Sequence, residues 1–179
     1  DHSDVSLSYS KRLSRPAFRE LNNDVFKLND FRYSIGNPDL RPEYIDRYHL
    51  SYHYKKQNAS IYYHQYNDAI NGIYFLVDSI AYYQRQNNGA QKQVGIEYNT
   101  SGKLQDWWSV RGSIHFFHRK YTTDEGEDLF KKSTVSIRLF NTFHINETTS
   151  VDLSGRYMSP YADAFYEQDA YYYINLILK

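Results

Sequence analysis

The seven histidines of the chain are the first residues to consider for metal chemistry, because imidazole is the commonest metal ligand in proteins. His49 and His53 lie four residues apart, which is too far along an extended chain for one metal ion. His115 and His118 point to opposite faces of a strand. The acidic run from Asp124 to Asp128 lacks the ligand spacing of a calcium loop. These patterns predict no metal site.

Residues for covalent or hydrolytic chemistry show no recognisable arrangement either. The sequence contains no cysteine, so thiol nucleophiles, disulfides and thiolate metal sites are all excluded. It also contains no glycine-rich phosphate loop, no nucleophile elbow and no His-Glu-x-x-His motif. Acidic residues are plentiful, yet no pair is marked out as a glycosidase couple. We therefore expect neither an enzyme nor a bound cofactor.

Strict alternation of apolar and polar residues is the dominant pattern along the chain. In its first segment Val5, Leu7 and Tyr9 alternate with serines, as expected for a strand with one apolar face. The same period of two recurs near residues 44–55, 59–72, 91–102, 107–120, 134–143, 151–157 and 172–179. The sequence therefore predicts an all-β fold, an antiparallel meander of about eight strands.

The connections between these segments alternate between short and long. Short joins occur at residues 55–58, 101–106 and 146–149, and long polar segments occupy residues 13–43, 73–90, 121–129 and 160–169. Outer-membrane barrels have short periplasmic turns and long extracellular loops, whereas a soluble sandwich has no reason to lengthen every second connection. The pattern favours a transmembrane barrel whose strands are long enough for a tilted crossing.

The composition suits a sheet that meets both an apolar and a wet environment. Tyrosine contributes 20 residues and aromatic residues 18% of the chain, while the mean hydropathy is -0.76. Basic and acidic residues number 21 each, so no net basic field exists to bind nucleic acid. Charged residues on the face opposite the apolar one suit a hydrated lumen better than lipid. They are Arg47, Arg111, Arg138, Arg156, Glu97 and Asp152.

One segment, residues 36–43, joins a glycine and two prolines directly to an alternating strand. Pro38 and Pro42 fix their own backbone angles, and the residues before them are pushed to extended conformations. Such a segment suits the start of a strand, because prolines inside a paired strand would remove ladder hydrogen bonds. The motif residues are Gly36, Asn37, Pro38, Leu40, Pro42 and Glu43.

This segment resembles the Gly-Asn-Pro-x-Leu-x-Pro-Glu signature of TonB-dependent outer-membrane receptors. The stretch at residues 9–22 resembles the strand end and loop that precede the signature in the Bacteroidetes-type outer membrane protein beta-barrel family. The stretch at residues 61–70 resembles the strand that follows it. The resemblance implies that residues 1–179 form a partial receptor barrel, part of a larger transmembrane β-barrel, with the N-terminal plug domain and the remaining strands absent.

The resemblance further implies a function in the bacterial cell outer membrane. We expect lipid around the barrel, TonB contacted through the missing N-terminal region, and uptake of a small scarce nutrient such as a ferric siderophore, a glycan or a peptide. Aromatic and basic loop residues are candidates to stack on or pair with that ligand. They are Arg32, Tyr33, Tyr82, Tyr83, Arg85, Tyr161, Phe165 and Tyr166. An extracellular aromatic girdle would use the same residues.

Other functions are compatible with the same patterns. A small, complete eight-stranded outer-membrane barrel, acting as an adhesin or structural module, would suit the strand count. A soluble, aromatic-rich β module that binds carbohydrate would suit the composition, and it predicts a monomer that is stable without detergent. An outer-membrane enzyme would need a perturbed acidic pair or a Ser-His couple in the lumen.

Overall fold

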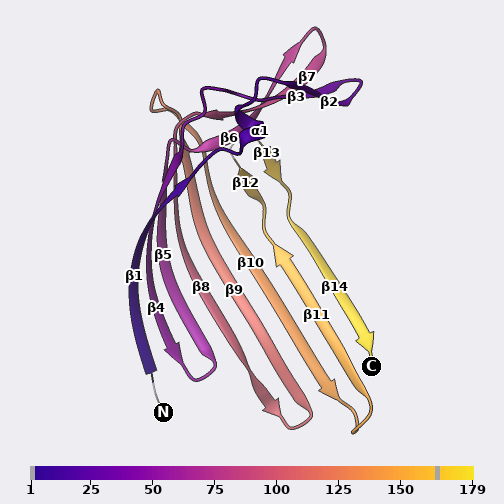
Figure 1. The fold of residues 1–179 in the computed structure, drawn as a ribbon. Helices are drawn as coiled ribbons and strands as arrows, with labels where there is room; N and C mark the ends of the chain where they lie inside the picture. Colours follow the sequence, from indigo (N-terminus) through magenta and orange to yellow (C-terminus); the bar gives the residue numbers. More distant parts are fainter. Residues whose placement is uncertain (1–2, 164–165) are drawn as a thin grey trace.

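One long sheet of eight strands dominates the computed structural model, which describes residues 3–163 and 166–179. In sheet order the strands are β1 (Ser3–Ser14), β4 (Glu43–Tyr54), β5 (Gln57–Asn67), β8 (Ala90–Gln105), β9 (Trp108–Thr122), β10 (Asp128–His144), β11 (Ser150–Met158) and β14 (Tyr171–Leu178). Every neighbouring pair is antiparallel. Figure 1 shows a tall, curved sheet with β1 and β14 at its two edges. The predicted antiparallel meander is confirmed.

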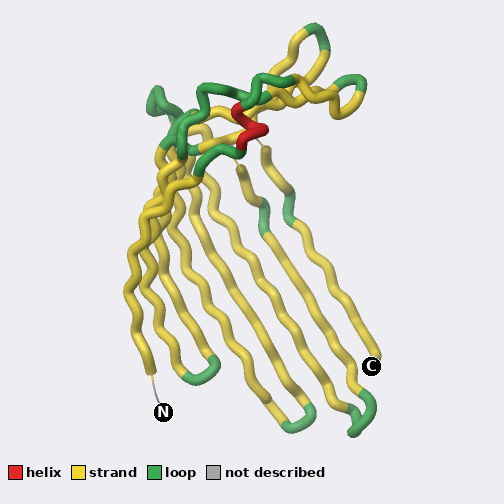
Figure 2. The backbone as a smooth tube through the Cα atoms, in the orientation of Figure 1, coloured by secondary structure: helices red, strands yellow, loops and turns green. Residues whose placement is uncertain are grey.

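The two ends of this sheet differ in how the strands are joined. At one end the connections are tight turns, and Lys55 takes a φ of 54° in the turn between β4 and β5. At the other end β9 and β10 are joined by residues 123–127 alone, so the long connection predicted at residues 121–129 is wrong, because its two ends extend these strands. The other three connections at this end are long and carry further elements (Figure 2). These elements are α1 (Phe18–Leu21), β2 (Val25–Asn29), β3 (Arg32–Ile35), β6 (Ile70–Val77), β7 (Ile80–Asn87), β12 (Tyr161–Asp163) and β13 (Tyr166–Gln168). No helix within the described residues is long and apolar enough to cross a membrane.

A second sheet, built entirely from long connections, lies over one end of the main sheet. Its four strands run in the order β2-β3-β7-β6, and we call it the cap sheet. Strands β3 and β7 pair in parallel, with Arg32 opposite Ala81 and Ile35 opposite Gln84. This pairing was not predicted, because it joins two connections that are far apart in the sequence. The alternation of residues within one connection does not indicate which strand of another connection will pair with it.

The main sheet has one apolar and one polar face. On the apolar face, which we call the outer face, Ile96 is 52% exposed and Ile174 is 69% exposed. The opposite inner face carries Gln93 and Thr134, whose side chains are buried although they are polar. Apolar side chains line up across neighbouring strands because the register keeps residues of one parity opposite each other.

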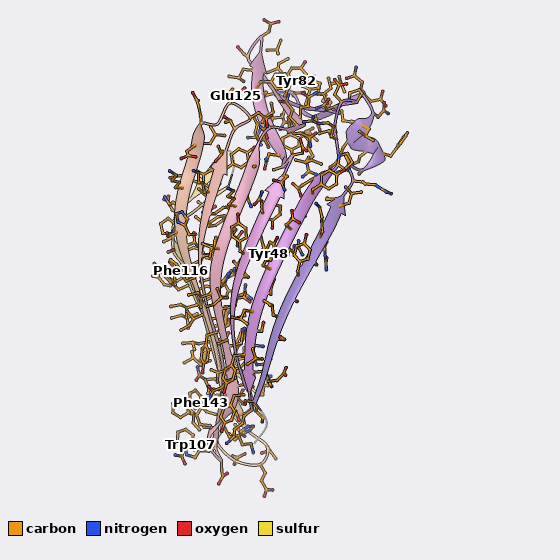
Figure 3. The ribbon with its side chains drawn as sticks, turned by 90° about the vertical axis from the view of Figure 1, so that its left-hand side faces the viewer. Tyr48, Tyr82, Trp107, Phe116, Glu125 and Phe143 are labelled. Atoms are coloured by element: carbon orange, nitrogen blue, oxygen red, sulfur yellow. The ribbon has the colours of Figure 1, made fainter. Side chains whose placement is uncertain are left out.

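Aromatic side chains gather at two levels of the outer face. About halfway along β1, β4 and β5, the rings of Tyr9, Tyr48 and Tyr63 lie side by side, with centroids 4.8 and 6.2 Å apart. At the tight turns, the rings of a second group stack with centroids 5.7 to 6.1 Å apart. This second group is Trp107, Trp108 and Phe143, and Figure 3 shows two of its members at the turn end.

The spacing of these two aromatic groups matches a bilayer. Tyr63 of β5 is opposite Val94 of β8, and Val94 is opposite His118 of β9. Along β9, His118 lies ten residues from Trp108. At roughly 3.4 Å per residue and a tilt of roughly 40°, that stretch of strand spans about 26 Å. The apolar band of outer-membrane barrels is about 25 Å tall and bordered by aromatic girdles. The outer face therefore has the dimensions of a lipid-facing surface.

Candidate functional site

The cap sheet carries a row of three aromatic side chains, which we call the aromatic row. Tyr33 of β3 is opposite Tyr82 of β7, and Tyr82 is opposite Phe75 of β6. Residues in register on one face of a sheet are neighbours, so the three rings lie next to one another. Their centroids are 5.6 and 5.7 Å apart and their planes differ by only 23° and 13°. Figure 3 places Tyr82 beyond the ends of the long strands. Such a row offers a stacking surface to a ligand.

The opposite face of the cap sheet forms one side of a pocket of about 510 Å³, the cap pocket. Phe26, Leu28 and Tyr83 supply its apolar walls. Its charged groups are Arg19 and Glu20 from the short helix α1 and Arg85 from strand β7. Apolar walls with a few polar groups in a cavity of this size are typical of small-molecule sites. The cap sheet therefore presents a stacking surface on one face and a pocket on the other.

An ion pair fastens α1 to the cap sheet inside this pocket. Nη1 of Arg85 donates a hydrogen bond of 2.6 Å to Oε1 of Glu20, whose other carboxylate oxygen accepts one of 2.8 Å from the amide of Ala17. Burial raises the pKa of Glu20, but the hydrogen bonds from Arg85 and Ala17 and the Arg85 charge together hold it below its usual range. The same hydrogen bond with Glu20 raises the pKa of Arg85. Both groups are charged at neutral pH.

Acidification is expected to release α1. A carboxyl whose pKa is lowered on folding stabilises the fold above its unfolded pKa and loses that contribution as the pH falls through its folded value. Hydrogen exchange of the α1 amides, corrected for intrinsic rates, should therefore accelerate several-fold in strong acid. Glu20→Gln should show the faster exchange already at neutral pH, whereas Glu125→Gln on an exposed turn should not. Equal exchange in all three proteins would contradict this role of Glu20.

The sequence motif forms the junction between the cap sheet and the main sheet. Strand β4 begins at Glu43, whose side chain accepts a 3.0 Å hydrogen bond from the amide of Ile70 at the start of β6. The side chain of Asn87 in β7 contacts both backbone groups of Arg41, at 2.7 and 2.9 Å. Arg41 also forms a 2.8 Å ion pair with Asp68. The motif therefore connects the cap sheet to the start of a long strand.

The first half of the motif packs against α1. The amide of Asn37 donates a 2.6 Å hydrogen bond to the carbonyl of Glu20, and its side chain donates one of 3.0 Å to the carbonyl of Arg85. Gly36 is buried, and Leu40 is only 7% exposed. A Cβ built on Gly36 would lie 1.8 Å from the carbonyl oxygen of Asn22, so only glycine fits at this position. Two segments of the connection between β1 and β4, residues 20–22 and 36–37, meet here without space between them.

The predicted ligand-binding residues lie in several different parts of the structure. Tyr33 and Tyr82 lie together in the aromatic row, and Tyr83 and Arg85 line the cap pocket. Arg32 is exposed at the start of β3. Tyr161 and Tyr166 lie apart from the cap sheet, in the short pair β12 and β13. Phe165 lies outside the described residues.

Several residues of the site were not found from the sequence. Phe26 and Leu28 alternate with Lys27, which was a local sign of a strand in the first long connection. Phe75 had no local sign of its role, because it joins the aromatic row only through the pairing of β6 with β7. The role of Glu20 depends equally on a distant partner.

The inner face of the main sheet carries a polar network. The Nε2 atoms of His49 and His64 lie 2.7 Å apart, which fits one shared proton. The side chain of Gln93 donates a 2.6 Å hydrogen bond to the hydroxyl of Tyr62, which also lies 2.8 Å from Nε2 of His115. Within the described residues, no three histidine or carboxylate side chains are placed to hold a metal ion.

Taken together, these features define part of an outer-membrane β-barrel: long antiparallel strands, an apolar outer face between aromatic girdles, a polar inner face, and elaborate connections at one end only. A family profile described as "Outer membrane protein beta-barrel family" matches residues 1–179, and the chain belongs to that family. The predicted family and its location in the outer membrane are therefore confirmed. The alternative prediction of a soluble carbohydrate-binding module is therefore wrong, because the family is one of outer-membrane proteins.

A solved structure is similar over almost the whole chain. It is the crystal structure of the siderophore receptor PirA from Pseudomonas aeruginosa, with a TM-score of 0.71 and 12% sequence identity. The match covers 98% of this chain and 33% of that one, so the chain spans a third of the length of the receptor it matches. At this identity the likeness shows the fold alone. A comparison with curated proteins found no match.

Proposed function

We propose that this chain is the barrel portion of a TonB-dependent receptor that takes up a scarce nutrient across the outer membrane. The observation that carries the proposal is the cap sheet, which holds the aromatic row and the cap pocket at one end of a membrane-sized band. The family, the likeness to a receptor barrel and the signature at residues 36–43 support it. The full receptor would add a plug domain, the remaining strands and a TonB-contacting segment.

In this proposal, binding and transport require no bond chemistry. A ferric siderophore, a glycan or a peptide would stack on the aromatic row and pair with polar groups of the cap. The junction at residues 36–43 joins the cap directly to the start of β4. A ligand held on the cap is therefore connected to the barrel wall through ordered backbone rather than through a flexible linker.

Uptake by the full-length protein in its own bacterium tests the proposal. A strain lacking the gene is compared with its parent for uptake of a panel of labelled iron complexes, oligosaccharides and peptides. We expect one class to be lost in the gene deletion and equally in a strain lacking TonB. Unchanged uptake of the whole panel, or uptake that persists without TonB, would contradict the proposal.

Replacing Tyr82 by alanine should weaken this uptake. Tyr82 is the central ring of the aromatic row, so its removal breaks both stacking contacts and the surface they form. A stacking contact contributes about 0.5–1.5 kcal/mol, so uptake at limiting ligand should fall about two- to ten-fold. Tyr172→Ala on the outer face is the matched control and should transport normally. Equal uptake by the two variants would exclude the aromatic row from ligand binding.

A further inference from the structure

A groove on the inner face of the main sheet, near the tight turns, is lined by basic residues. Two adjoining depressions of about 480 and 450 Å³ share Lys56, Ser101, Arg111 and Phe140 in their walls. Lys103 and Arg138 are among the other cationic side chains in the walls. We call the two depressions together the basic groove. Among the described residues that line it, none is aspartate or glutamate.

The arginines of the basic groove converge because of the strand register. Arg138 of β10 is opposite Ser113 of β9, and Phe140 of β10 is opposite Arg111 of β9. The two arginines are therefore diagonal neighbours on one face of the sheet. The guanidinium of Arg111 lies over the ring of Phe140, 5.7 Å from its centroid. This contact holds the planar guanidinium on one side and leaves its N–H donors for another partner.

Four cations of the basic groove lack carboxylate partners among the described residues, although the chain contains as many acids as bases. Neither arginine, nor Lys56, nor Lys103 forms an ion pair with any described residue. A nearby inner-face carboxylate is already engaged, because Asp152 accepts a hydrogen bond of 2.7 Å from Thr142 and pairs with Lys179 at 2.7 Å. The basic groove therefore holds positive charge that the described fold leaves uncompensated.

We propose that the basic groove binds a small organic or inorganic anion that carries several carboxylate or phosphate groups. Arginine forks match both groups in bidentate geometry, and lysines add point charges around them. Amide and hydroxyl side chains in the walls, such as Asn58, Asn99 and Ser113, supply further hydrogen bonds. The volume suits a small molecule. The claim that this anion is the transported nutrient rests on the proposed function. The claim that the basic groove binds an anion does not.

Arg119, on the inner face near the cap, differs from the two arginines of the basic groove in having polar partners. It donates hydrogen bonds to Gln93. Between that level and the basic groove, Glu97 lies 3.9 Å from His115, so hydrogen bonds and a carboxylate accompany the cations outside the groove. Arg47 shares the inner face with the basic groove but lies outside it. A general attraction of anions to the lumen would involve Arg47 as much as Arg138. A specific site would not.

Calorimetric titration of the purified full-length protein in detergent tests the inference. The probes are citrate and pyrophosphate at low ionic strength, with a neutral disaccharide as a negative probe. We expect both anions to bind and the disaccharide to give no signal. Arg111→Gln and Arg138→Gln should each weaken binding at least ten-fold, whereas Arg47→Gln should change it less than two-fold. Unchanged heat-modifiable migration on gels verifies that each variant is folded.

Two results would overturn the inference. Absence of binding by the wild-type protein would mean that another part of the receptor, such as an acidic protein segment, fills the basic groove. Equal weakening by all three substitutions would mean general electrostatic attraction rather than a site. Neither result depends on TonB or on uptake. Anion binding with TonB-independent uptake would refute the proposed function alone, and TonB-dependent uptake without anion binding would refute only this site.

Discussion

Leu139→Lys is expected to destabilise the protein in a bilayer, whereas Ser154→Lys at nearly the same depth is expected to be tolerated. Leu139 projects from the outer face near the middle of the apolar band, where its side chain is 47% exposed. It is flanked by Gly112 and Gly155 on the neighbouring strands, so no large side chain there would shield a charge from lipid. Ser154 of β11 is opposite Phe140 and lies on the inner face.

The expected difference follows from the lipid environment. A lysine on the lipid face of a barrel costs about 2–4 kcal/mol at the midplane, while lumen positions remain hydrated. Folding of both variants into liposomes, followed by denaturant titration, measures the free energy of unfolding. The fraction of heat-modifiable protein in cell envelopes gives an independent readout. If Ser154→Lys proved as damaging as Leu139→Lys, the assignment of outer and inner faces would be wrong.

Gly36→Ala is expected to detach the cap sheet while leaving the barrel wall intact. The added Cβ would lie 1.8 Å from the carbonyl oxygen of Asn22 and 3.0 Å from that of Glu20. Both are backbone atoms, so no side-chain rotation relieves the overlap, and the two segments of this connection must separate. Overpacking of this kind costs about 1–3 kcal/mol, and more where the backbone has to move. Uptake should therefore fall at least as far as with Tyr82→Ala.

Limited proteolysis of intact cells measures this detachment directly. Trypsin sites at Arg19 and Arg32 lie in the connection that the overlap would displace, so cleavage there should accelerate in Gly36→Ala. Heat-modifiable migration of the barrel should stay normal. Gly102→Ala is the matched control, because a Cβ at that position would meet nothing within 4 Å. A Gly36→Ala protein as resistant to trypsin as the control would refute the close junction.

Much of the fold was predictable because its pattern is local. The strand with Tyr48, Leu50 and Tyr52 on one face and His49 and Ser51 on the other was read directly from alternation, and β4 has those faces. The alternation of short and long connections predicted which end of the sheet would carry tight turns. The prediction of a long connection at residues 121–129 was wrong, because β9 runs on to Thr122 and β10 begins already at Asp128, which leaves only residues 123–127 between them.

The candidate site was predictable only in part. Residue type and a place in long connections predict a ligand-binding role for Tyr33 and Tyr82, and the cap sheet brings them into contact. The same grounds apply to Tyr161, but it lies in a different element, β12. Residue type and loop position identify which side chains are suited to bind a ligand. They do not say which loops pair with each other.

The sequence by itself therefore determined the class of structure, the two faces of each strand, the membrane assignment and the junction at residues 36–43. Tertiary structure alone decided the parallel pairing of β3 with β7, the pairing of Glu20 with Arg85 and the convergence of Arg111 and Arg138 in the basic groove. The physical reason is the range of each interaction. Side-chain alternation is a property of adjacent peptide units, whereas these contacts depend on the register and pairing of separate strands and loops.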